Sequence, residues 1–153
     1  MLRISKLADY GTVVMVCLVR STPMLCSARD LAEKTHLAVP TVSKILKSLT
    51  SAGLLSSERG VAGGYRLKRP PADISVAQIV HALDDSRGLT ECSVHSGSCS
   101  LQGVCQIQGN WQAISHAVEA ALESVSLETL AQPVMSKVNI ERVKTLASGV
   151  YRD

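Results

Sequence analysis

Residues 40–68 read PTVSKILKSLTSAGLLSSERGVAGGYRLK, and this stretch decides the fold class. Four apolar residues recur in its first part with the spacing of one helical face: Val42, Ile45, Leu46 and Leu49. Pro40 suits the first turn of this helix, because its missing N–H is not needed there. Gly53 supplies a left-handed C-terminal stop. The first part therefore predicts an amphipathic helix with one buried face.

A β-hairpin is expected directly after that helix. Residues 54–59 and 65–68 have the character of two short strands, and the segment 60–64 between them contains three glycines. Glycine tolerates positive φ, which the tip of a tight hairpin needs. Arg59 stands at the entry to this tip, where an arginine can reach a narrow, electronegative minor groove of DNA.

Two further helices are expected before residue 40. Residues 5–20 have a helical apolar stripe that includes Leu7, Val14 and Leu18. Ser27 and Asp30 have the spacing of a capping box, and the helix that they open ends near residues 35–36. The order helix, turn, helix, hairpin predicts a mainly α protein of the winged helix-turn-helix class.

In such a fold, the helix at 40–51 would present its polar face to DNA. We expect base contacts near the start of this helix and phosphate contacts farther along it. The candidates are Thr41, Ser43 and Lys44 for bases, and Lys47 and Ser48 for the backbone. The charge distribution supports this hypothesis, since residues 1–70 hold 11 Lys/Arg against 4 Asp/Glu, whereas residues 71–153 hold 5 against 9. Double-stranded DNA is therefore the expected partner.

The second half of the chain predicts a helix opened by Ser75 and Gln78, a cysteine-containing loop over residues 86–108, and a long helix. The apolar stripe of the long helix exceeds what a small protein readily covers, which favours a homodimer seam over packing within one chain. Its members are Trp111, Ile114, Val118, Ala121, Leu122 and Val125. We expect three parts: a DNA-binding domain over 1–72, a cysteine loop with a dimerisation helix over 73–132, and a tail over 133–153.

Cys92, Cys99 and Cys105 lie in one glycine- and serine-rich stretch. Clustered thiolates are soft ligands for iron–sulfur or zinc, or else a redox pair with a spare thiol. No apolar stretch is long enough to cross a membrane, so we expect a cytoplasmic protein without a membrane partner. In that compartment, cysteines favour metal or redox chemistry over a disulfide framework. Cys17 is expected to be a small buried residue.

No arrangement of paired carboxylates, nucleophile and base, or phosphate-binding loop predicts an enzyme. A small iron–sulfur electron carrier is the alternative of a different class, but it does not explain the basic first half.

Three motifs together resemble the IscR/NsrR/RirA-type (Rrf) family of bacterial winged-helix regulators over about residues 1–132. They are the opening MLRISKLADY, the segment RGVAGGY at 59–65 and the three loop cysteines. The opening decapeptide is most similar to the branch that regulates SUF iron–sulfur assembly. The resemblance implies a homodimeric repressor on pseudo-palindromic promoter DNA, with an iron–sulfur cluster of the 2Fe-2S type on Cys92, Cys99 and Cys105.

The fourth ligand departs from one pattern of this family. IscR-type proteins have a histidine three residues after the last cysteine, and this chain has Gln108 there. The resemblance to NsrR-type proteins implies Asp9, provided by the partner subunit, and His95 is a further candidate. The alternatives for the signal are nitric oxide, and a thiol switch that uses the same cysteines.

Overall fold

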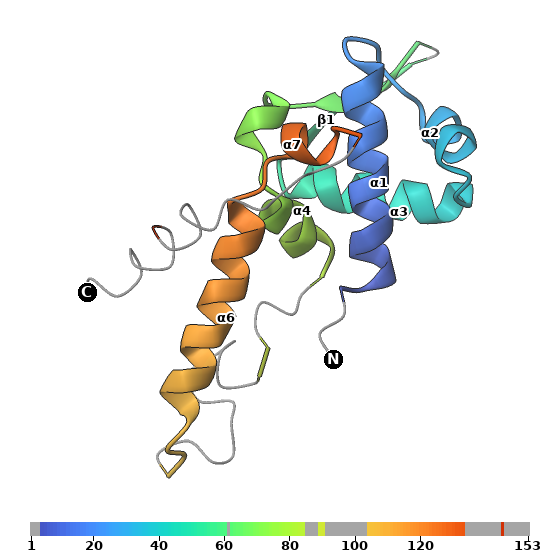
Figure 1. Cartoon of the computed structure of the whole chain (residues 1–153). Coiled ribbons are helices and arrows are strands. Elements are labelled where there is room, and N and C mark those ends of the chain that lie inside the picture. The colour runs from blue at the N-terminus through green and yellow to red at the C-terminus, as the bar shows by residue number, and fades with distance from the viewer. Residues whose placement is uncertain (1–3, 61, 85–88, 91–103, 134–144, 146–153) are drawn as a thin grey trace.

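The computed structural model describes residues 4–60, 62–84, 89–90, 104–133 and 145. Its elements are α1 (Lys6–Ser21), α2 (Ala28–Thr35), α3 (Val39–Ser51), β1 (Leu55–Glu58), β2 (Gly64–Leu67), the 3-10 turn η1 (Pro71–Asp73), α4 (Val76–Leu83), α6 (Gln108–Glu123) and α7 (Leu127–Leu130). The mainly α winged helix-turn-helix expected from the sequence is confirmed (Figure 1). None of the described helices has the length and apolar character to cross a bilayer.

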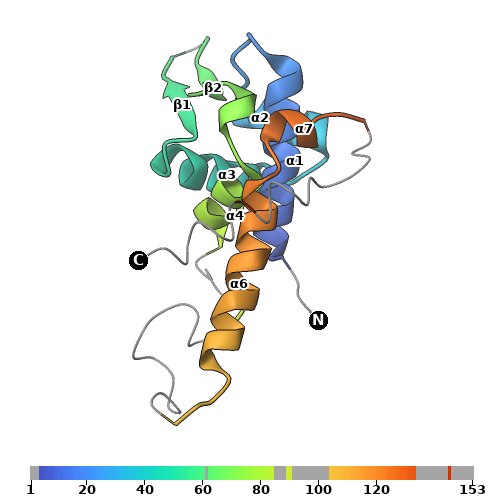
Figure 2. The same ribbon diagram turned by 60° about the vertical axis from the view of Figure 1, so that its left-hand side comes forward.

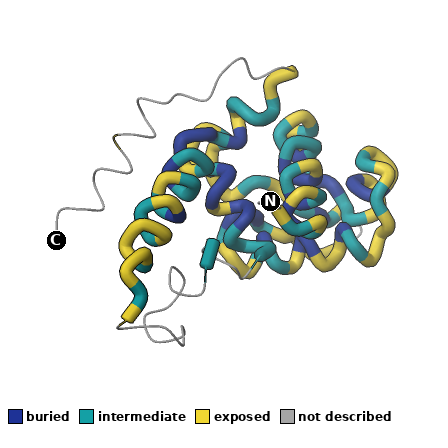
Figure 3. The backbone as a smooth tube through the Cα atoms, turned by 60° about the horizontal axis from the view of Figure 1, so that its bottom comes forward, coloured by how far each residue is buried: buried dark blue, intermediate teal, exposed yellow. Residues whose placement is uncertain are grey.

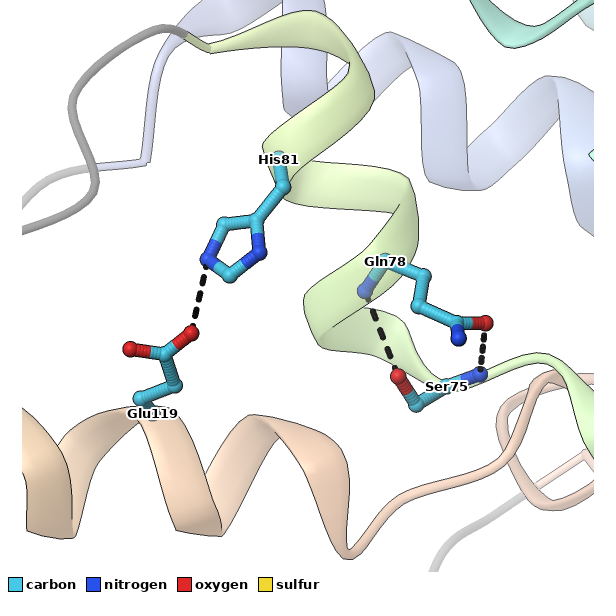
Figure 4. Close-up of polar contacts among 4 residues, drawn as sticks. All are labelled: Ser75, Gln78, His81 and Glu119. Atoms are coloured by element: carbon cyan, nitrogen blue, oxygen red, sulfur yellow. Dashed lines mark hydrogen bonds and ion pairs between the residues drawn. The ribbon is translucent and has the colours of Figure 1, made fainter. Parts of the chain in front are cut away.

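Serine is the N-cap residue of most of the described α-helices. The hydroxyl of Ser27 accepts a hydrogen bond from the Asp30 N–H at 3.2 Å, and the Asp30 carboxylate accepts from the Ser27 N–H at 2.9 Å. Ser75 and Gln78 form the same reciprocal pair at the start of α4 (Figure 4). Both capping boxes expected from the sequence are thus confirmed. Each satisfies N–H groups that would otherwise lack an intrahelical partner.

The core lies where α1, α3 and α4 meet. All four stripe residues of α3 are completely buried, together with Val14 and Met15 of α1 and Ile79 of α4. Gly11 permits the close approach of α1 to α4, because a Cβ at this position would overlap the Leu83 side chain. Burial of this apolar surface is the main stabilising contribution to the fold.

The hairpin is anchored to the helical core through β2. The strands β1 and β2 are antiparallel, with Leu55 opposite Leu67 and Glu58 opposite Gly64. Tyr65 also pairs with Cys26, and the two residues exchange backbone hydrogen bonds of 2.9 and 3.1 Å. Gly64 must be glycine here, because an added Cβ would lie 2.8 Å from the Cys26 carbonyl oxygen. The wing is therefore held against the segment that leads into α2.

Helix α6 reaches away from the rest of the molecule, and its N-terminal end lies farthest out (Figures 1 and 2). Beyond it, the chain returns to the core: Leu127 is completely buried, and its N–H donates to the Ile74 carbonyl at 2.7 Å. The long helix ends at Glu123, so Val125 follows the helix instead of lying on its face as expected. Val125 is nevertheless buried, and its carbonyl accepts from the Val76 N–H at 2.9 Å.

Candidate functional site

The exposed face of α3 combines short polar side chains with two cations. Ser43, Lys44 and Lys47 are exposed, whereas Thr41 and Ser48 are half-buried at the edges of the apolar stripe. The order of polar and apolar residues in α3 produces this division, because the buried stripe leaves one side of the helix to solvent. Four of the five α3 residues predicted to contact DNA lie within the two helical turns of residues 41–47.

The N-terminus of α3 is open. Its N-cap is Ala38, which provides no side-chain hydrogen bond, and Pro40 lies in the first turn. The N–H groups of an uncapped first turn carry partial positive charge and attract phosphate oxygens. Lys44 and Lys47 add full positive charges one and two turns farther along. This end of α3 is suited to approach a polyanion.

Two arginines of the wing have different surroundings. Arg66 forms an ion pair with Glu58 across the hairpin, with a distance of 2.7 Å between Nη2 and Oε1. Arg59 is exposed at the start of the hairpin tip, and no ion pair joins it to another described residue. Gly60 beside it has a φ of 116°, a conformation that L side chains rarely adopt. Arg59 thus keeps its charge available, while the charge of Arg66 is balanced within the wing.

The predicted cysteine site lies only partly within the described residues. Cys105 is half-buried and precedes the first turn of α6, whereas Cys92, Cys99 and His95 lie outside the described residues. Asp9 is exposed in the first turn of α1. In the described part of the chain, no three metal-ligating side chains come together. The donor set of the sequence, three thiols with one at the outer end of α6, is chemically suited to iron–sulfur.

The outer part of α6 carries apolar side chains that the described residues leave exposed. Trp111 is 38% exposed and Ile114 is 47% exposed, and Ile107 just before the helix is also exposed. The only buried residues of this helix are Ser115 and Ala120. In Figure 3, most of the α6 backbone has the colours of exposed and intermediate residues. The sequence predicted this apolar stripe, and its outer end is exposed in the described part of the chain.

Polar contacts connect α6 to α4 and to the segment after α4. The His81 Nε2 atom of α4 lies 3.3 Å from the Glu119 carboxylate of α6 (Figure 4). One turn earlier on α6, the hydroxyl of buried Ser115 accepts a hydrogen bond of 3.3 Å from the Leu89 N–H. Sequence reasoning missed both contacts, because neither the loop geometry nor the rotation of α6 follows from local patterns. They join the long helix to the winged-helix unit.

Comparison with known proteins identifies the family. The family model described as Rrf2, iron-dependent transcriptional regulator, matches residues 4–133. The chain belongs to the Rrf2 family. It is therefore a DNA-binding transcriptional regulator, and its homologues are regulators rather than enzymes.

Relatives within the Rrf2 family cover most of the chain. The HTH-type transcriptional regulator IscR of Aliivibrio salmonicida is 30% identical over 117 residues, which are 73% of this chain and 69% of that protein. The structure of CymR, the global cysteine regulator of B. subtilis, has a TM-score of 0.68 at 28% identity and covers 86% of this chain and 97% of CymR. The T. potens IscR structure has a TM-score of 0.64 at 28% identity, covering 83% and 84%.

Proposed function

We propose that this Rrf2-family protein is a cytoplasmic, homodimeric regulator that responds to an iron–sulfur cluster. The observation that carries the proposal is the presence of three cysteines at positions 92, 99 and 105 in a chain whose family is described as iron-dependent. We further propose that it represses genes of SUF iron–sulfur assembly, because its opening decapeptide is most similar to that branch. We propose that residues 1–72 bind DNA and that residues 73–132 sense the signal and form the dimer. Residues 133–153 are proposed to be a tail.

DNA binding is proposed to use α3 and the wing together. Thr41, Ser43 and Lys44 would contact base edges, and Lys47 and Ser48 would contact phosphates. Arg59 would enter the minor groove beside them. The exposure of Lys44, Lys47 and Arg59 supports these roles, as does the absence of an ion-pair partner for Arg59 within the described part of the chain. In a symmetric dimer, the two α3 helices would bind half-sites about one DNA turn apart or a multiple of it.

The cluster, proposed to be of the 2Fe-2S type, would be held by Cys92, Cys99 and Cys105. Bound to thiolates, such a cluster supplies a redox-sensitive, oxidant-labile group. Asp9 of the partner subunit is the fourth ligand that we favour, with His95 as the alternative. The exposure of Asp9 on α1 leaves its carboxylate accessible to a second chain. Cys105 lies three residues before the start of α6, so ligation of its thiolate would restrain the outer end of that helix.

The direct test is anaerobic reconstitution of the full chain with iron and sulfide. We expect a visible charge-transfer spectrum and about two iron and two sulfide per chain, as a 2Fe-2S cluster requires. The Cys92→Ala, Cys99→Ala, Cys105→Ala variant should stay colourless. Cys26→Ala is the matched control, because Cys26 is buried in the winged-helix core and should not affect the spectrum. A colourless wild-type protein would refute the cluster.

DNA contacts are tested separately by operator titration at several salt concentrations. Lys44→Ala and Arg59→Ala should each weaken binding by about tenfold and reduce the salt dependence. Arg20→Ala removes the same charge on α1, outside both α3 and the wing, and should leave binding unchanged. Unchanged binding by the first two variants would show that the reading surface lies elsewhere.

A second candidate function is a thiol-based repressor without a cluster. The similarity of fold to CymR, a global cysteine regulator, supports this alternative. Nitric-oxide sensing through the same cysteines is a further alternative for the signal. The reconstitution experiment separates these functions, since a thiol repressor would respond to oxidants while remaining colourless. Promoter occupancy measured during nitric-oxide exposure and during iron limitation would then identify the signal.

A further inference from the structure

A groove with unbalanced positive charge is lined by residues of α1, α2 and α7. Figure 1 shows α1 between α2 and α7. The groove has a volume of about 670 Å³, which lies within the range of small-molecule sites. Its lining residues are Thr12, Val13, Val16, Cys17, Arg20, Ser21, Lys34, Thr35 and Leu130. Two of these are cations and none is acidic.

Both cations are held by neutral groups. The Lys34 ammonium donates to the Ser21 hydroxyl at 3.1 Å and lies 3.9 Å from the Cys26 sulfur. The Arg20 guanidinium donates through Nη2 to the Ala131 carbonyl at 3.4 Å. Neither cation has an ion-pair partner within 4 Å among the described residues. Lys34 and Arg20 therefore keep donors and charge for an incoming anion.

The remaining lining divides into hydroxyls and an apolar wall. The Thr12 and Thr35 hydroxyls donate to helix carbonyls at 2.7 and 2.6 Å, so their protons are already used and are not offered to a ligand. Val13, Val16 and Leu130 offer apolar surface next to the two cations. A cationic end beside an apolar wall fits an amphipathic anion, because burial of its body and pairing of its head act together.

Cys17 was expected to be buried in the core, but it is half-buried and lines this groove. Burial raises the pKa of its thiol, against the opposing effect of the Lys34 ammonium. The thiol is therefore mostly protonated at neutral pH and is a poor nucleophile. We assign it no redox role, and it provides instead a chemical probe placed inside the groove.

We propose that this groove is a binding site for a small organic carboxylate with an apolar portion, with Arg20 and Lys34 holding the carboxylate. The inference does not rest on the cluster, because none of its proposed ligands lines the groove. Guanidinium groups match the planar geometry of a carboxylate, and Lys34 of α2 adds a second charge. Such a ligand would join α2, which precedes α3, to α7.

The test uses the full chain with octanoate as the probe. We expect octanoate to give saturable heat in calorimetry and to protect Cys17 from alkylation, mapped by mass spectrometry of its peptide. Octan-1-ol lacks the charge and acetate lacks the apolar body, and each should bind at least about tenfold more weakly. Equal binding of octan-1-ol would overturn the proposal, because the groove would then be a plain apolar patch.

Variants distinguish this site from general charge attraction. Arg20→Gln and Lys34→Gln should each weaken octanoate binding by about tenfold, the usual effect of losing a charged hydrogen bond. Arg29→Gln removes the same charge from an exposed position of α2 outside the groove and should bind as the wild type does. Lys34→Arg should keep binding within about threefold. Wild-type affinity of both glutamine variants would overturn the assignment.

Discussion

Helices α1 and α6 are both 16 residues long, but they are stabilised in different ways. Helix α1 begins with a Ser5 side-chain cap and buries Val14, Met15 and Leu18. Helix α6 begins after Ile107 with no side-chain cap, and it buries only Ser115 and Ala120 while Trp111 and Ile114 stay exposed. The first helix buries most of its apolar stripe against the core, although Val13 stays 43% exposed. The described residues leave the apolar face of the second helix partly exposed, which supports the proposed homodimer.

The largest expected effect comes from shortening an isoleucine to alanine at two places, one in the core beside α1 and one on α6. Ile45 is fully buried under α1, and Ile45→Ala should lower the free energy of unfolding by about 2–5 kcal/mol at any protein concentration. Ile114→Ala removes a side chain that is half exposed within the chain, so its effect should depend on protein concentration. Urea titrations at two concentrations 100-fold apart would check this. If both variants lost equal stability at both concentrations, α6 would be buried like α1.

The next effect concerns association itself. Trp111→Ala with Ile114→Ala should weaken the dimer by about 30-fold or more, because large apolar side chains at the centre of an interface contribute most of its affinity. Sedimentation velocity over a dilution series would measure the shift to monomer. Met24→Ala is the control, since Met24 is a more exposed apolar residue located between α1 and α2. A wild-type protein that is monomeric, or a double variant that stays dimeric, would contradict the seam on α6.

Local patterns predicted the winged-helix half closely. The four stripe residues of α3 are all buried, both capping boxes are present, and each strand lies within about one residue of its expected range. These features depend on residues that are close in the sequence, so their spacing is sufficient to find them.

Contacts between distant segments could not be predicted in the same way. The pairing of Tyr65 with Cys26 and the return of Leu127 to the core depend on how the chain folds back. The same reason explains Cys17, whose position in α1 predicts burial, although the surrounding helices leave a groove beside it. For the site, the sequence indicated which residues of α3 face outward. It did not indicate that Glu58 balances Arg66 and leaves Arg59 unpaired within the described part of the chain.

Replacing a glycine by alanine should have opposite effects on stability in the wing, at Gly64, and in α6, at Gly109. Gly64→Ala would place a Cβ against the Cys26 backbone, which cannot move without displacing the wing. We expect a loss of about 1–3 kcal/mol in unfolding free energy and weaker operator binding. Gly109→Ala in α6 meets open space, and it should raise helix stability by up to about 1 kcal/mol. Denaturation and operator titration of both variants check this, and a harmless Gly64→Ala would show that the wing is not held by this contact.

The smallest expected effect concerns the start of α2, which has a capping box where α6 has no side-chain cap. Ser27→Ala should cost about 1 kcal/mol of unfolding free energy, because it removes the acceptor for the Asp30 N–H.

Hydrogen bonds from the Ser27 hydroxyl and then from its N–H lower the pKa of the Asp30 carboxyl. A lowered folded-state pKa stabilises the protein above the ordinary carboxyl pKa of about 3.9, and this stabilisation is lost as pH falls through the folded-state value. The difference between wild type and Asp30→Asn should therefore be full near pH 6 and shrink below about pH 4. Urea midpoints measured across this range provide the check. A difference that stayed constant with pH would mean that the Asp30 charge contributes nothing to the cap. The first turn of α6 contains no acidic residue, so this loss of stability in acid is expected from the start of α2 and not from the start of α6.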